Sequence, residues 1–390
     1  MIQPEPTAQV ALSDTQTMVI DAAESFCSNQ STVARVRSLL QSAAGNDSPG
    51  FNEDVWSQCI AQGWPASMVS KENGGIGLGL GSAVCISESL GRHLLSVPLI
   101  SSWLAATVIE TNATVAQRSR WLADIVAGDV ASVALLDNED WGAPCVALTA
   151  VEREGGWLLR GTKRFVADAT TANTFVVAAT CHYADGRTEP RWLYVRASQL
   201  PEGAVTPSLL IDETKRAASV CFDEVLVTPD AVMRAADFHV GFTRLQLAGA
   251  LLHAAEAAGA AASALRCMVS YINTRVQFGR LIGANQALKH PAVDALNAIN
   301  AARSLIYHAT TVFAAEGFSR DFGIACRMSK VQADEALLFV ADRTVQFHGG
   351  MGFTYDCDAQ LYIRRAQWAR QVYGDATQHR SQLAALLFDN

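Results

Sequence analysis

Residues 271–280 read YINTRVQFGR, and this stretch holds the first of two motifs that decide how the chain is interpreted. Arg275, Phe278 and, beyond the next turn, Gln286 bring a cation, an aromatic ring and an amide to one predicted helix end. A guanidinium binds phosphate oxygens and an aromatic ring packs against a nucleobase, so the set suits a nucleotide. Taken alone, the same residues also fit a capped helix end.

The second motif is the glycine-rich stretch 346–353, which reads QFHGGMGF and begins with Gln346. Gly349, Gly350 and Gly352 let another group approach the backbone closely, and such a turn presents N–H groups to phosphate. Glycines also end helices, so a Gly-Gly turn by itself leaves that alternative open.

Long helices surround these motifs from about residue 235 onward. The segment Leu245–Tyr271 is alanine-rich and apolar nearly all round, which predicts a helix at the centre of a bundle. Pro291 is expected at the start of the next helix, where its missing N–H is tolerated. Further helices are predicted over Ser329–Phe347 and Asp358–Tyr373.

A strand-rich zone precedes them, between about residues 131 and 230. Two runs flank Gly155-Gly156 and predict a hairpin, and further strand candidates follow at Phe175–Ala179, Trp192–Val195 and Ser219–Val227. No helical segment separates these strands, which favours an antiparallel barrel or sandwich. Before residue 128, apolar residues recur at helical spacing. The predicted fold is therefore α+β: an N-terminal helical domain (1–130), a middle β domain (131–232) and a C-terminal helical bundle (233–390).

Composition excludes several classes of function. The 390 residues carry a net charge of −8, which argues against a nucleic-acid partner. No run reaches the roughly 18–20 apolar residues of a membrane span, and the N-terminus lacks the pattern of a secretory signal. The nine cysteines form no C-x-x-C pair, which argues against a zinc or redox site and favours buried thiols in a reducing, cytoplasmic compartment.

The two motifs in combination, with Leu361-x-x-Arg364-Arg365 after them, resemble the C-terminal domain of acyl-CoA dehydrogenases. The resemblance implies an α-domain, a β-domain and a C-terminal four-helix bundle, with FAD lying across two subunits. It also implies that six residues here hold the ADP half of a neighbour's FAD: Arg275, Phe278, Gln286, Gln346, Gly349 and Gly350.

The chain departs from that family where the catalytic base belongs. The chemistry removes a substrate α-proton with a carboxylate while a hydride passes to the flavin. In the commonest slot, before the last helix, alignment places Tyr373 or Gly374, and in a second slot known in the family it places Gly249. No catalytic residue is therefore assigned in this chain.

The segments expected near the flavin ring also depart from the family. Leu135–Pro144 lacks the usual T-E-P-x-x-G-S pattern, and Phe165-Val166-Ala167 replaces Trp-Ile-Thr. The half-site offered to a neighbour is thus retained while the chain's own is altered. This predicts a heteromer in which a homologous partner carries the catalytic Glu.

The resemblance further implies acyl-CoA thioester substrates, steroid side chains among them, and electron-transfer flavoprotein as the electron acceptor. Two alternatives stay open: a self-sufficient homotetramer using a non-standard base such as Asp375, and a non-enzymatic scaffold without FAD. Glu256 is expected to be a satisfied buried carboxylate and His348 a packing residue. Lys163 and Arg164 are expected to be exposed charges at a strand edge, with a phosphate contact as the alternative.

Overall fold

The computed structural model describes residues 12–43, 51–143 and 145–388. Residues 1–11, on which the signal-sequence expectation rests, and Pro144 lie outside the described residues. The chain packs as two compact units. Within the described residues, the helical unit comprises 12–38, 80–95 and 250–388, and the sheet unit comprises 39–79 and 96–249.

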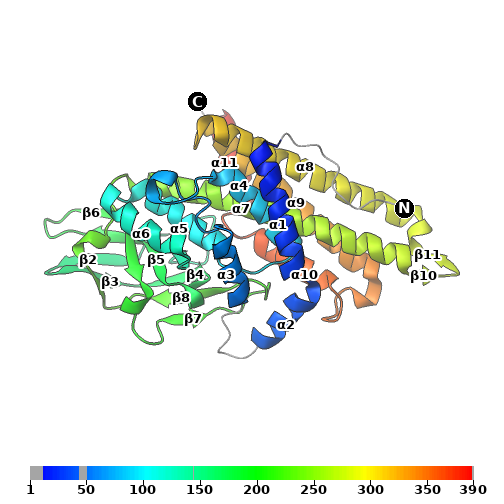
Figure 1. Ribbon diagram of the computed structural model, residues 1–390, viewed down its shortest axis with the longest axis horizontal. Helices are drawn as coiled ribbons and strands as arrows, with labels where there is room; N and C mark the ends of the chain where they lie inside the picture. Colours follow the sequence, from blue (N-terminus) through cyan, green and yellow to red (C-terminus); the bar gives the residue numbers. More distant parts are fainter. Residues whose placement is uncertain (1–11, 44–50, 144, 389–390) are drawn as a thin grey trace. The chain divides into compact units, whose positions relative to one another are not determined.

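The helical unit is built around long helices near the C-terminus. Within it α8 packs against α9, and α9 also contacts α10 and α11 (Figure 1). A short hairpin, β10 and β11, joins α7 to α8. Its elements are α1 (Asp14–Gln30), α2 (Val33–Ala43), α4 (Gly79–Arg92), α7 (Phe238–Thr274), β10 (Val276–Gln277), β11 (Arg280–Leu281), α8 (Gln286–Glu316), α9 (Arg320–His348), α10 (Ala359–Ala369) and α11 (Ala376–Phe388). Residues 39–43 of α2, Gly79 of α4 and residues 238–249 of α7 belong to the sheet unit.

Two glycines let α4 and α7 cross with their backbones in contact. A Cβ on Gly91 would lie 1.9 Å from the carbonyl oxygen of Glu256, and a Cβ on Gly259 would lie 1.9 Å from that of Glu88. Any side chain at either position would push the helices apart. The apolar all-round segment of α7 is accordingly buried, which confirms its predicted place at the centre of the bundle.

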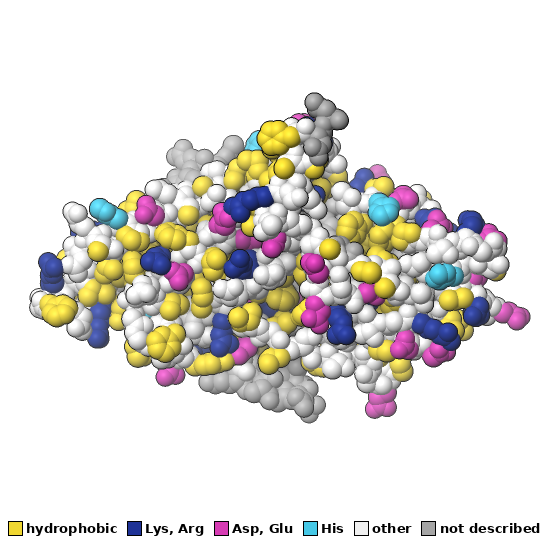
Figure 2. Space-filling model, turned by 180° about the vertical axis from the view of Figure 1, so that it is seen from behind, with side chains coloured by type: hydrophobic (Ala, Val, Ile, Leu, Met, Phe, Trp, Pro, Cys, Tyr) yellow, Lys and Arg dark blue, Asp and Glu magenta, His cyan; other side chains and the backbone are white. Residues whose placement is uncertain are grey.

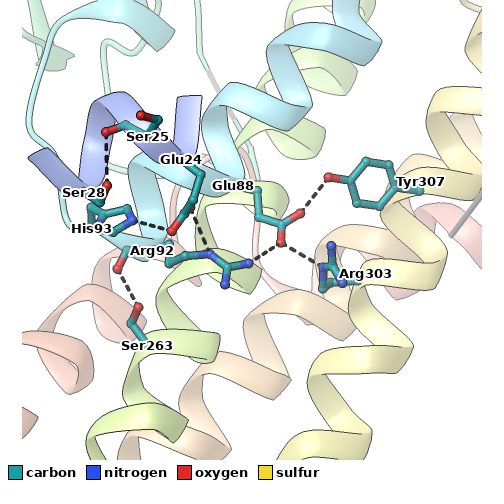
Figure 3. A network of polar contacts seen from close by, with 9 residues as sticks. All are labelled: Glu24, Ser25, Ser28, Glu88, Arg92, His93, Ser263, Arg303 and Tyr307. Carbon is teal, nitrogen blue, oxygen red and sulfur yellow. Dashed lines mark hydrogen bonds and ion pairs between the residues drawn. The ribbon is translucent and has the colours of Figure 1, made fainter. Parts of the chain in front are cut away.

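A buried ionic network ties α8 and α1 to α4 beside this crossing (Figure 3). The Glu88 carboxylate accepts hydrogen bonds from Arg92 Nη2 at 3.1 Å, Arg303 Nε at 2.8 Å and the Tyr307 hydroxyl at 2.7 Å. Arg92 continues to the half-exposed Glu24 of α1 at 3.5 Å. The charges are therefore paired inside the unit, as buried charges must be.

The sheet unit contains a six-stranded and a three-stranded sheet. In the larger one the order is β1-β5-β2-β3-β9, with β6 paired to β5; in the smaller it is β4-β8-β7. The strands are β1 (Ala131–Ala134), β2 (Thr149–Arg153), β3 (Gly156–Arg160), β4 (Thr162–Ala167), β5 (Thr174–His182), β6 (Thr188–Arg196), β7 (Val205–Pro207), β8 (Ala217–Cys221) and β9 (Val225–Val227).

Helices α3 (Glu53–Ala61), α5 (Leu99–Asn112) and α6 (Val115–Ala127) complete the sheet unit, and α5 packs on β1 and β5. The chain also forms short 3₁₀ turns at Lys71–Asn73, Ala169–Thr171, Ala197–Gln199, Pro229–Ala231, Ile282–Ala284 and Gly349–Met351.

The predicted succession of helical, β and helical zones is confirmed, while the exact domain boundaries stay a prediction. The hairpin around Gly155-Gly156 is present as β2–β3. Its second run, however, divides at Gly161, whose φ of +133° turns the chain into the other sheet as β4. The larger sheet is also mixed rather than wholly antiparallel, because β1 and β2 both pair with β5 in parallel.

Two helix boundaries differ from the prediction. Helix α8 begins at Gln286, so Pro291 lies inside it and removes one intrahelical hydrogen bond rather than starting the helix. The helix predicted over Asp358–Tyr373 ends at Ala369, and α11 follows. The Asp375 carboxylate accepts a hydrogen bond from the Gln378 backbone N–H at 2.8 Å and so caps the start of α11.

Among the described residues, none of the helices has the length and apolar character needed to cross a membrane. On the face drawn in Figure 2, cationic and anionic side chains are interspersed, with hydrophobic ones between them. A surface of this kind has no broad field of one sign.

Candidate functional site

The first motif forms an exposed arm at the end of α7, here called the arginine arm: Arg275, Phe278 and Gln286. Arg275 follows the last residue of α7, is exposed, and its guanidinium makes no hydrogen bond or ion pair with any residue that the structure describes. Gln286 is exposed as the first residue of α8. A cation and an amide are therefore accessible to a ligand from outside the chain.

Phe278 occupies a strained position at the tip of the arginine arm. Strands β10 and β11 enclose a two-residue loop, Phe278-Gly279, with φ values of +52° and +75°. Two positive φ angles define a type I′ turn, which normally takes Asn-Gly. A bulky residue there is costly, and the ring is fully solvent-exposed at 101% of its reference area. A strained backbone that holds an aromatic ring in solvent indicates that the ring contacts a ligand or another chain.

The second motif forms the glycine arm: Gln346, Gly349 and Gly350. Gln346 is exposed in the last turn of α9, and Gly349 ends the helix with φ +63°. A Cβ added to Gly349 or Gly350 would meet nothing within 4 Å, whereas one on Gly352 would lie 2.2 Å from the Val345 carbonyl oxygen. Gly352 is thus required by packing, while the first two glycines present open backbone.

The structure brings the two arms together within the helical unit. The rings of Tyr271, near the end of α7, and His348, near the end of α9, stack with centroids 4.1 Å apart. One end of the bundle therefore carries a cation, an exposed ring, two amides and an open glycine turn. These groups fit the phosphates and adenine of an ADP moiety.

Neither base slot before the last helix holds a carboxylate. Tyr373 is buried, its ring lies 5.3 Å from the His253 ring, and burial raises the pKa of its hydroxyl, so the group stays neutral at physiological pH. At Gly374, φ is +101°, which strains any side chain, and a Cβ would also lie 1.8 Å from Gln378 Oε1 and require that side chain to move. Gly249 is buried in α7.

Two acidic residues considered in the sequence, Asp375 and Glu256, form hydrogen bonds or ion pairs within the chain. Asp375 caps α11, as described above. Glu256 is 3% exposed and forms an ion pair with the buried Arg365 at 3.0 Å, which confirms the prediction of a satisfied buried carboxylate. Within these contacts both carboxylates stabilise helices.

In the sheet unit, the segment that replaces T-E-P-x-x-G-S is held internally. The Asp137 carboxylate accepts hydrogen bonds from Lys163 Nζ at 2.6 Å and from the backbone N–H groups of Ala147 at 2.8 Å and Leu148 at 3.1 Å. Asn138 Nδ2 donates to the Ala143 carbonyl at 2.8 Å. Several of the segment's polar groups are therefore satisfied by the chain itself.

The expectation that Lys163 is an exposed strand-edge charge is wrong. Its side chain is 0% exposed, and burial lowers its pKa to about 8 even though Asp137 favours the charged form. The neighbouring Arg164 is about half exposed, as expected. A register shift between Lys163 and Val166, with φ +49° at Phe165, then turns Val166 inward.

Two family models match the chain. "Acyl-CoA dehydrogenase, N-terminal domain" covers residues 13–129, and "Acyl-CoA dehydrogenase, C-terminal domain" covers residues 243–388. The second includes both arms of the candidate site.

Individual relatives agree with these matches. The acyl-CoA dehydrogenase IpdE2 of Mycolicibacterium smegmatis is 27% identical over 347 residues, which is 89% of this chain and 92% of that protein. FadE12 of Mycobacterium tuberculosis is 27% identical over 327 residues, covering 81% and 83%.

Among solved structures, a Tcur3481–Tcur3483 steroid ACAD variant superposes with a TM-score of 0.80 at 28% identity over 96% of this chain and 98% of that chain. The ChsE4–ChsE5 complex from Mycobacterium tuberculosis shares the fold with a TM-score of 0.84 at 22% identity, covering 97% and 99%. The chain belongs to the acyl-CoA dehydrogenase family, whose members are flavoproteins that oxidise CH–CH bonds.

Proposed function

We propose that this chain is the non-catalytic subunit of a heteromeric, FAD-dependent acyl-CoA dehydrogenase. Its arginine and glycine arms form the ADP-side wall of a FAD site, and a homologous partner supplies the flavin-ring pocket and the catalytic Glu. When bound, FAD accepts the hydride taken from the substrate. Arg275 would hold a phosphate, Phe278 would pack on the adenine, and Gln286, Gln346 and the Gly349-Gly350 backbone would supply polar contacts.

The single observation that carries this proposal is the contrast between exposed and internally satisfied groups. Arg275 and Phe278 are exposed, and Gly349 and Gly350 present open backbone. By contrast, the chain's own base slot offers no reactive group, since Tyr373 is buried and the φ of +101° at Gly374 disfavours a side chain. A chain built in this way serves a cofactor whose reactive end is held by another subunit.

The geometry argues against the self-sufficient alternative. A general base must reach the substrate's α-proton. The bond that the structure gives the Asp375 carboxylate is the capping one from Gln378 N–H to Oδ1, which supports a structural role. The scaffold alternative gives no reason to keep an exposed phenylalanine in a type I′ turn, because that turn costs stability without a ligand.

The similarity to a steroid ACAD supports a proposal for the substrate class. A structure named as a steroid ACAD is similar over nearly the whole chain, so the assembled enzyme is expected to act on bulky, steroid-derived CoA thioesters. Electron-transfer flavoprotein is the expected acceptor. The discriminating assay compares steroid side-chain CoA esters with short linear ones in the assembled oligomer.

The proposal is tested by Arg275→Ala in the oligomer in which the chain purifies. A charge-assisted phosphate contact contributes about 1.5–3 kcal/mol, so the Kd for FAD should rise about 10- to 150-fold. Arg320→Ala is the matched control, since Arg320 is an exposed arginine at the opposite end of α9 and should leave the Kd unchanged. An unchanged Kd in Arg275→Ala would contradict the assignment.

A further inference from the structure

The rings of Tyr271 and His348 form an aromatic contact between the ends of α7 and α9, next to the two arms. Tyr271 lies one helical turn before Arg275, and His348 directly precedes Gly349. Their ring centroids are 4.1 Å apart with an interplanar angle of 27°, so the rings stack face on face. A displacement of either ring would change the distance between the ends of α7 and α9.

The His348 ring is held in one orientation. Its Nδ1 lies 2.7 Å from the Thr344 carbonyl oxygen one turn earlier in α9, and an oxygen of this kind only accepts, so Nδ1 carries the hydrogen. In the neutral ring Nε2 is then the acceptor, and it faces the Cys267 thiol of α7 at 3.8 Å. His348 is thus fixed by its own helix and by two residues of α7.

The functional groups beyond these rings lack anchors of their own. Gly349 and Gly350 have no side chains, and nothing lies within 4 Å of where a Cβ would be. Arg275 is exposed and its side chain makes no bond to any residue in the described part of the chain. The last buried residue before the open glycines is His348, and Tyr271 meets it from the α7 side.

We propose that Tyr271 and His348 form a positioning pair that sets the separation of the arginine and glycine arms, and thereby the affinity for the ADP half of FAD. The inference rests on the proposed function. Each ring is assigned a positioning role, acting through the backbone segment next to it. A site for a charged, extended group requires such fixed spacing, because phosphate contacts lose strength when they are displaced by an ångström.

The test measures the Kd of FAD for the apo form of the oligomer in which the chain purifies, by quenching of flavin fluorescence. Tyr271→Ala and His348→Ala should each weaken binding about 3- to 10-fold, the range expected for one aromatic pair. The double variant should be no weaker than the worse single one, because partners in one contact are not additive. Tyr271→Phe keeps the ring and should bind FAD as the wild type does.

A matched control separates positioning from general loss of stability. Tyr307→Phe removes a buried hydrogen bond elsewhere in the helical unit and should lower Tm without changing the Kd. Where Tyr271→Ala does not fold, Tyr271→Leu fills the space without a planar ring and takes its place. Three results would each overturn the positioning role of the two rings. They are unchanged FAD affinity in both single variants, additive losses of affinity in the double variant, and a Tyr271→Phe protein that binds FAD as weakly as Tyr271→Ala.

Failure of this inference is distinguishable from failure of the proposed function. If Arg275→Ala weakens FAD binding while the Tyr271 and His348 variants do not, only the positioning role falls. If Arg275→Ala also has no effect, or if the wild-type oligomer does not bind FAD, the ADP-side site itself is absent and the inference falls with it.

Discussion

Replacement of Glu88 by Gln should be among the most damaging single changes in the helical unit. The carboxylate is 7% exposed and accepts hydrogen bonds from Arg92, Arg303 and Tyr307 (Figure 3). A neutral amide leaves two guanidinium groups without their shared counter-charge. Breaking a buried ion pair from one side costs about 3–5 kcal/mol. Arg92 keeps a partial partner in Glu24, so we expect about 3 kcal/mol.

Urea unfolding followed by circular dichroism provides the measurement, with two comparisons. Tyr307→Phe removes one hydrogen bond to the same carboxylate and should cost less, about 1.5–2 kcal/mol. Glu335→Gln breaks an exposed pair with Arg380 and should cost less than about 1 kcal/mol. A Glu88→Gln protein within 1 kcal/mol of the wild type, or more stable than Tyr307→Phe, would show that the Glu88 charge does not hold the network together.

Two further predictions concern the start of α11 and the residue just before it. Burial, together with Lys330 and Arg327, lowers the pKa of His379 to about 4 from 6.5, so the unfolded chain binds more protons between these values and stability is lost as pH falls through that window. The stability difference between the wild type and His379→Gln should therefore shrink by about 1–2 kcal/mol from pH 7 to pH 5, measured by urea titration at each pH; a pH-independent difference would contradict this. Burial raises the pKa of Asp334 to about 6, which increases stability as pH falls. This contribution is the same in both proteins and cancels in the comparison. Asp375→Asn should change the activity of the assembled enzyme less than about twofold, because Asn also caps helices. Removal of a catalytic base would lower the activity about 10²–10⁴-fold, and a loss of that size would identify Asp375 as the base.

Features with a local cause could be predicted from the sequence. The apolar, alanine-rich run of α7 leaves no polar face for solvent, so it had to be central. The predicted hairpin forms locally, with Glu154 and Gly155 as its two-residue turn because Arg153 pairs with Gly156. The six candidate site residues were chosen by resemblance, and the structure presents the members of each arm on exposed chain.

Features that depend on distant partners could not be predicted from the sequence. The parallel pairing of β1 with β5 joins strands about 40 residues apart, and nothing local encodes it. The Phe278-Gly279 turn lacks the Asn-Gly or Asp-Gly signature of its type, so its strain becomes visible only in the backbone angles. The burial of Lys163 depends on Asp137, which lies 26 positions earlier in the chain.

The central claim is that this chain does not dehydrogenate acyl-CoA by itself. The most direct measurement takes the purified chain, reconstitutes it with FAD, and follows reduction of an artificial electron acceptor with acyl-CoA esters that include bulky, steroid-derived ones. The account predicts no turnover above the background of the reagents, and turnover when a homologous subunit bearing the catalytic Glu is added. Robust turnover by the single chain, retained without any partner, would contradict it.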